Sequence, residues 1–163
     1  YLVEACKILA SQDPGLSKQL GVVVFGKQAE QYASLFPFPI YPMNYVSNEK
    51  ELVDIYNAVD LYVTPSLQDN LPNTIVEAMA CGIPCVGFNV GGIPQMIDHL
   101  HNGYVAEYQS AKDLANGIRW TLTEGEYDNL SEEACRKALS SYSESIISMR
   151  YIDIYNKITG SHA

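Results

Sequence analysis

Residues 61–88 have the sequence LYVTPSLQDNLPNTIVEAMACGIPCVGF, in which two apolar runs enclose a polar loop and a helical segment. The runs at 61–64 and 84–88 are short and apolar, so each predicts a buried strand. The pattern at 74–80 predicts a helix, because Pro72 suits a first helical turn and a glycine and a proline follow the last apolar residue. A strand, a helix and a strand in this order indicate a βαβ unit with parallel strands.

The polar loop at 66–73 would lie at the carboxyl end of a parallel strand, where ligands of such sheets bind. It leads into a helix N-terminus, whose free amides and dipole favour an anion such as a diphosphate. Asp69 and Glu77, eight positions apart, are expected to accept hydrogen bonds from hydroxyls on either side of it, those of a ribose and a sugar. The alternative is structural: Asp69 caps the helix and Glu77 is solvated or ion-paired.

The rest of the chain alternates the same two kinds of element. Strands are expected at 22–25, 38–41 and 104–106, and helices at 2–9, 28–35, 49–58, 93–97, 111–123, 131–140 and 143–158. Prolines around 38–41 place that strand at a sheet edge. The pattern indicates one α/β domain over 1–163, a Rossmann-like parallel sheet with helices on both faces.

Composition narrows the function classes. The 163 residues are 47% hydrophobic and 18% charged, enough to bury the core of one domain. A net charge of −9 would repel a nucleic-acid backbone, so no nucleic acid is expected as a partner. The four cysteines lack zinc-type spacing and are expected to be reduced thiols, as in a cytoplasmic protein. No transmembrane segment or signal peptide is visible, and the chain opens within a helical pattern, as expected of part of a longer protein.

The segment that contains Asp69, seven further residues and then EAMACGIPCV from Glu77 onward resembles the donor-site signature of family four (group 1) of the retaining GT-B glycosyltransferases. That signature has two glutamates separated by seven residues, followed by Ala-Met-Ala-Cys-Gly-x-Pro-Val. Weaker similarity covers the whole chain, including GGIP at 91–94 and NGYV at 102–105. The resemblance implies the C-terminal half of a GT-B fold, which binds the nucleotide sugar.

The same resemblance implies roles for individual residues. Glu77 would bind the ribose hydroxyls, and Asp69, the candidate catalytic residue, would bind hydroxyls of the transferred sugar. Three further sets are implied: the donor-binding residues Asn70, Leu71, Pro72, Asn73 and Thr74, the base pocket Tyr45, Val46 and Ser47, and a phosphate or sugar loop with Gly26, Gly91 and Gly92. No metal and no cofactor is expected, because dipoles and basic side chains would stabilise the leaving diphosphate.

The chain departs from the family pattern in ways that affect these expectations. Asp69 is one methylene shorter than the family's glutamate, so its reach to the sugar is shorter. The family's first strand of this domain, with its phosphate-binding arginine and the lysine that follows, would precede Tyr1 and is missing here, as is the acceptor-binding N-terminal domain. We therefore expect the strands at 22–25 and 61–64 either to pair directly or to leave exposed edges, which would allow a homodimer.

The expected function is donor binding in a hexosyltransferase that moves a sugar from a UDP-, GDP- or ADP-sugar to a glycan or glycolipid with retention. The fragment alone is expected to be inactive, and the full-length enzyme to be cytoplasmic and peripheral to the inner face of the membrane. Two alternatives stay open: a GT-B-type nucleotide-sugar epimerase, which the Ala-Met-Ala-Cys-Gly string disfavours, and a non-catalytic nucleotide-binding or scaffold module. Loss of nucleotide binding in Glu77→Ala would argue against the scaffold.

Overall fold

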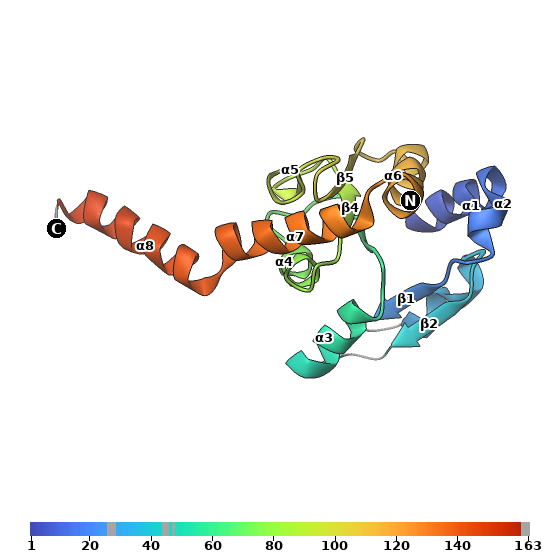
Figure 1. Cartoon of the computed structure of the whole chain (residues 1–163), viewed down its shortest axis with the longest axis horizontal. Coiled ribbons are helices and arrows are strands. Elements are labelled where there is room, and N and C mark those ends of the chain that lie inside the picture. Colours follow the sequence, from blue (N-terminus) through green and yellow to red (C-terminus); the bar gives the residue numbers. More distant parts are fainter. Residues whose placement is uncertain (26–28, 44–45, 47, 161–163) are drawn as a thin grey trace.

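A computed structural model of the chain describes residues 1–25, 29–43, 46 and 48–160 (Figure 1). Its elements, in chain order, are α1 (Leu2–Gln12), α2 (Pro14–Ser17), β1 (Val22–Phe25), the 3-10 helix η1 (Ala29–Leu35), β2 (Ile40–Met43), α3 (Glu49–Asn57), β3 (Tyr62–Thr64), α4 (Asn73–Ala80), β4 (Cys85–Phe88), α5 (Ile93–Met96), β5 (Gly103–Ala106), α6 (Ala111–Thr123), α7 (Tyr127–Tyr142) and α8 (Glu144–Thr159). Helices and strands alternate from α2 to β5, and this order confirms the expected α/β class.

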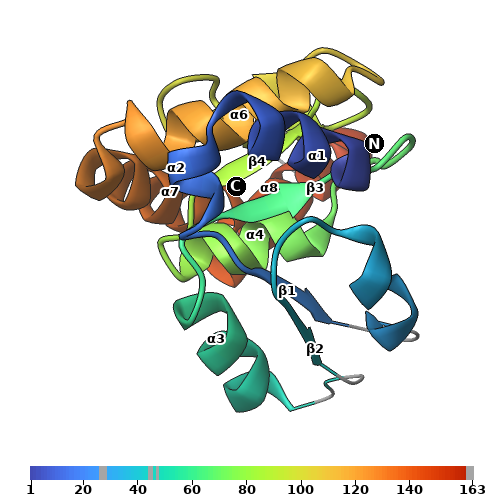
Figure 2. The same cartoon turned by 90° about the vertical axis from the view of Figure 1, so that its right-hand side faces the viewer.

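The main sheet consists of β3, β4 and β5, all parallel and in that order. Because successive side chains of a strand point to opposite faces, β4 contributes to two cores. Val86 and Phe88 pack with α1 and α6, whereas Cys85 packs with α4 and α7. Figure 2 shows β3 and β4 enclosed between α1 and α6 on one side and α4 on the other. The predicted covering of both faces by helices is therefore confirmed.

The strands β1 and β2 form a second parallel sheet, in which Val22 pairs with Ile40 and Phe25 with Met43. Among the described residues β1 forms no ladder with β3, so the strands are divided between two parallel sheets. A cavity of about 730 Å³ lies between these two strand edges, lined by mostly apolar side chains of α1, β1, α3, β3 and α6. Two arrangements were expected for these strands. Direct pairing of β1 with β3 is excluded for the described residues, and the facing edges of the two strands are left unpaired.

Several element boundaries differ from the sequence-based expectation. The segment expected to be a helix at 28–35 forms η1, and the edge strand expected at 38–41 is Ile40–Met43. Pro42 is tolerated in β2 because that strand pairs with β1 alone among the described strands. The helix α7 extends to both sides of the expected 131–140, since α4 covers its apolar face with Ala134 and Ala138 buried between them.

The last helix, α8, projects away from the rest of the chain (Figure 1). None of its residues is buried, and Ile152 and Ile158 are 56% and 77% exposed. Tyr151 and Tyr155 contact each other along its surface, with ring centroids 6.4 Å apart. None of the helices in the described part of the chain is both long and apolar enough to cross a membrane.

Candidate donor-binding site

The start of α4 has no side-chain cap. Pro72 is its N-cap residue and makes no side-chain capping hydrogen bond, and the first turn holds no acidic residue. The Ile75 amide donates to the Pro72 carbonyl oxygen at 3.1 Å, whereas no side chain caps the amides of Asn73 and Thr74. The helix dipole at this end would favour an external anion. The alternative prediction, in which Asp69 caps this helix, is wrong.

Glu77 is half-buried rather than fully solvated, and one of its carboxylate oxygens accepts a hydrogen bond. The Tyr56 hydroxyl donates to Glu77 Oε2 at 3.0 Å, and it also lies 3.3 Å from the backbone carbonyl oxygen of Thr74. A carboxylate has two oxygens and about four lone-pair sites, so acceptor capacity remains for a ligand. Burial first, then the hydrogen bond and the negative charge of Glu77, raise the pKa of Tyr56, which therefore stays a donor at neutral pH.

Asp69 lies in the loop between β3 and α4, half-buried. Its carboxylate makes no hydrogen bond and no ion pair with any residue in the part of the chain that the structure describes. Burial raises the pKa of Tyr62, the nearby Thr74 side chain offsets part of this increase, and the charges of Glu77 and Asp69 add to it. The charges of both carboxylates therefore contribute to the electrostatic environment of Tyr62.

The loop after β4 supports the loop that carries Asp69. A Cβ atom added to Gly91 would lie 1.7 Å from the backbone oxygen of Asp69, and one added to Gly92 would lie 1.7 Å from that of Asn70. The Gly92 amide donates to the Asp69 carbonyl oxygen at 3.4 Å. The two glycines are therefore needed for close backbone contact between the two loops. This contact holds the backbone of Asp69 against the loop that follows β4.

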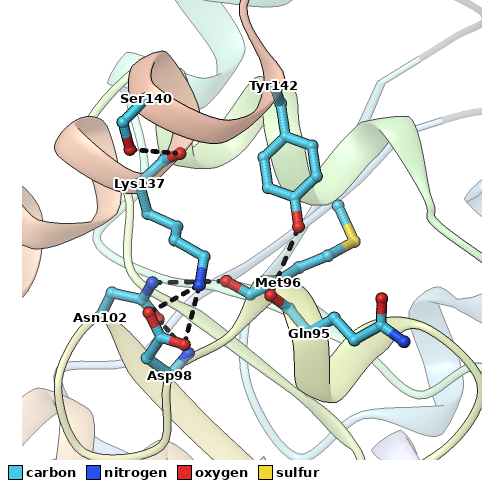
Figure 3. A network of polar contacts seen from close by, with 7 residues as sticks. All are labelled: Gln95, Met96, Asp98, Asn102, Lys137, Ser140 and Tyr142. Atoms are coloured by element: carbon cyan, nitrogen blue, oxygen red, sulfur yellow. Dashed lines mark hydrogen bonds and ion pairs between the residues drawn. The ribbon is translucent and has the colours of Figure 1, made fainter. Parts of the chain in front are cut away.

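A polar network holds the turn that follows α5 against α7 (Figure 3). The Lys137 ammonium lies 2.9 Å from each carboxylate oxygen of Asp98, and the Asp98 amide donates to Asn102 Oδ1 at 2.9 Å. Asn102 is 1% exposed and donates to the Met96 carbonyl oxygen at 3.4 Å. The Tyr142 hydroxyl donates to the Gln95 carbonyl oxygen at 3.3 Å, while the Gln95 side chain extends away from this contact (Figure 3). The network anchors the segment after the Gly91-Gly92 loop.

The predicted site residues are thus partly brought together. Asp69, Asn70–Asn73, Thr74 and Glu77 share one loop–helix segment, and Gly91 and Gly92 pack against it. Asn70, Leu71 and Asn73 are exposed, whereas Pro72 is buried. Gly26, Tyr45 and Ser47 lie outside the described residues, and Val46 is half-buried without a side-chain hydrogen bond. The roles of all these residues in donor binding, and the base pocket as a whole, stay predictions.

Most of the sequence matches the model of one protein family. Residues 1–138 match the family model "Glycosyl transferases group 1". The chain belongs to the group 1 glycosyl transferases. This confirms the resemblance drawn from the segment around Asp69 and Glu77.

Several relatives of this group 1 chain are named as glycosyltransferases. One is the N,N'-diacetylbacillosaminyl-diphospho-undecaprenol alpha-1,3-N-acetylgalactosaminyltransferase of Campylobacter jejuni, 30% identical over 117 residues that make up 71% of this chain and 31% of that protein. Another is the D-inositol 3-phosphate glycosyltransferase of Saccharomonospora viridis, 26% identical over 96% of this chain and 39% of that protein. The group 1 chain therefore spans about a third of the length of the relatives that it matches.

Solved structures share the fold. The crystal structure of Anabaena HepE in complex with UDP-glucose matches 96% of this group 1 chain and 44% of its own chain, with a TM-score of 0.76 at 20% identity. The match confirms the fold as that of a GT-B glycosyltransferase domain.

Sequence reasoning missed two aromatic residues of the site in this group 1 chain. Tyr56 lies within the helix expected at 49–58 and Tyr62 within the strand expected at 61–64, and the sequence pattern assigns neither of them a role in the site. The available signal was the hydroxyl of Tyr56, because a buried phenol requires a hydrogen-bond partner. That partner, Glu77, is 21 positions away and was not identifiable from local spacing.

Proposed function

We propose that the chain is the donor-binding domain of a glycosyltransferase that moves a hexosyl group from a nucleotide diphosphate sugar to a glycan or glycolipid acceptor, with retention. The observation that carries the proposal is the start of α4, which no side chain caps, within a loop–helix segment that contains both Asp69 and Glu77. In this reading Glu77 accepts hydrogen bonds from the ribose and Asp69 from the transferred sugar. The relatives support the proposal, since one acts on a diphospho-undecaprenol acceptor and one solved neighbour holds UDP-glucose.

The leaving diphosphate acquires negative charge during transfer, and fixed dipoles that point at it would lower the barrier. In this chain the dipole of α4 and the backbone amides of Asn70, Leu71 and Asn73 would supply that field. Asp69 repels the diphosphate, so it must interact with the neutral hydroxyls of the sugar rather than with phosphate. We expect no divalent metal to be needed, and EDTA is therefore expected to leave donor affinity unchanged.

The rest of the longer protein supplies an acceptor-binding domain and the missing strand. Tyr1 contacts Phe88, the last residue of β4, with ring centroids 5.6 Å apart, so the start of α1 lies at the carboxyl ends of the strands. A strand that leads into α1 would end at that edge and would run parallel to β1 and β3. Its place is the cavity between them, where it would pair with both edges. Residues 1–163 alone are then expected to be inactive, and a homodimer through these edges is expected only in the fragment.

The test uses the full-length enzyme, which we expect to be cytoplasmic and peripheral to the membrane. Titration calorimetry with a panel of UDP-, GDP- and ADP-hexoses should identify one donor that binds, and Glu77→Ala should weaken it at least about tenfold. Glu132→Ala, at an exposed position on α7, is the matched control and should bind as the wild type does. Unchanged binding in Glu77→Ala would favour the scaffold alternative.

Two product measurements test the chemistry. NMR of the glycosylated product should show the anomeric configuration of the donor, and an inverted product would remove the retention from the proposal. Conversion of the donor sugar in the absence of any acceptor would instead favour the epimerase alternative.

A further inference from the structure

Tyr56 lies at the inner face of α3 and is 1% exposed, yet its hydroxyl reaches the donor-binding helix. That hydroxyl donates to Glu77 Oε2 at 3.0 Å. It is the one hydrogen bond that a side chain in the described part of the structure makes to the Glu77 carboxylate. The orientation of Glu77 therefore depends on a residue of another helix.

The ring of Tyr56 is held from two sides. Phe25, the last residue of β1, packs edge-on against it with centroids 6.0 Å apart at 83°, and Tyr62 of β3 does so at 5.9 Å and 73°. Perpendicular contacts of this kind are favourable and restrict the ring in a close-packed core. The hydroxyl thus occupies a position set by both sheets and is not free to follow Glu77.

The chemistry of Tyr56 and Glu77 determines which of the two donates the hydrogen bond between them. A phenol buried beside a carboxylate stays protonated, so it can only donate and Glu77 can only accept. Hydrogen bonds to charged groups are the stronger ones in proteins, and the carboxylate accordingly favours the rotamer that keeps this bond. Oε2 is then occupied, whereas Oε1 keeps its lone pairs for a ligand hydroxyl.

We propose that Tyr56 is a positioning residue for the nucleotide site: it holds Glu77 in the rotamer in which the second carboxylate oxygen can accept from the ribose hydroxyls of a nucleoside diphosphate. This inference rests on the proposed function, in which Glu77 binds the ribose. Tyr56 touches no ligand in this account and acts only through Glu77.

The experiment compares the full-length wild type with Tyr56→Phe, which removes only the hydroxyl. The probe is whichever of UDP, GDP and ADP the wild type binds most tightly, together with its 2′,3′-dideoxy analogue. We expect Tyr56→Phe to weaken the nucleotide about three- to tenfold by calorimetry and to leave the dideoxy analogue unchanged. In a Glu77→Ala background the same substitution should have no further effect.

A matched control separates positioning from general stability. The Tyr104 hydroxyl also donates to a carboxylate, Asp113 Oδ1 at 3.0 Å, at the far side of the sheet in β5 and α6. Tyr104→Phe should lower the Tm without changing nucleotide affinity.

The outcomes are distinguishable. Equal weakening of the nucleotide and the dideoxy analogue, or additive losses with Glu77→Ala, would assign Tyr56 a merely structural role and overturn the inference while the donor site stands. If none of the three nucleotides binds the wild type, or Glu77→Ala binds as tightly as the wild type, the proposed function itself fails.

Discussion

A Cβ atom at Gly91 would lie 1.7 Å from the backbone carbonyl oxygen of Asp69, so the loops after β3 and β4 meet backbone to backbone. Gly91 also has a φ of 56°, in the left-handed region that side chains other than glycine rarely adopt. The contact holds the loop between β3 and α4 in a defined position. The Asp69 carboxylate in this loop has no hydrogen-bond or ion-pair partner among the described residues.

Gly91→Ala is therefore expected to displace the Asp69 loop. Strain in φ and the clash with the carbonyl should lower the free energy of unfolding by about 2–4 kcal/mol, measured by urea denaturation, and should weaken donor binding. Gly160→Ala is the matched control, because Gly160 also has a positive φ of 67° but nothing within 4 Å of the added Cβ. Equal effects of the two substitutions would show that the loop contact is unimportant.

Asp69→Asn separates function from stability. The side chain makes no hydrogen bond or ion pair with the residues that the structure describes, so the Tm should stay within about one degree of the wild-type value. The neutral amide is a weaker acceptor for sugar hydroxyls, and kcat/KM of the full-length enzyme should fall about ten- to a hundredfold. A clear loss of Tm would mean that Asp69 stabilises the loop instead.

Stability should fall in alkaline solution. Burial raises the pKa of the Cys6 thiol from its ordinary value of 9.0 to about 12, and it also raises the pKa of Cys85 and Tyr56. These groups ionise first in the unfolded chain, so their contribution is complete below about pH 9 and is lost as the pH rises through the folded-state values. Denaturation curves between pH 8 and 11 should show this decline, and Cys6→Ala should make it shallower. A flat profile would contradict the prediction.

Within the network of Figure 3, the buried amide should matter more than the ion pair. Asn102→Ala would leave the Asp98 amide and the Met96 carbonyl oxygen without their partner and should cost about 1–3 kcal/mol. Lys137→Met removes a partly exposed pair with Asp98, whose side chain is 48% exposed, and should cost at most about 1 kcal/mol. Urea denaturation of both variants tests the order, and the reverse ranking would refute it.

Much of the fold followed from local pattern. The β-branched run at 22–25 and the apolar run ending at Phe88 are strands as expected, and α4 begins beside Pro72 and ends before Gly82. These elements depend on hydrophobic periodicity and on proline and glycine at their ends, and both are properties of neighbouring residues. The loop–helix segment with Asp69 and Glu77 was found for the same reason, since both carboxylates lie within one stretch of chain.

The separation of β1 from β3 and the contact of Tyr56 with Glu77 could not be found in this way. Strand pairing depends on which edges meet in space: β2 pairs with one edge of β1, and the other edge faces the cavity that separates β1 from β3. The hydroxyl of Tyr56 reaches Glu77 because α3 and α4 lie side by side against the sheet. Order along the chain encodes elements and their ends, whereas the packing of distant side chains depends on the shape of the whole core. For this reason the sequence by itself identifies the two candidate carboxylates, and only the tertiary structure identifies the tyrosine that donates a hydrogen bond to one of them.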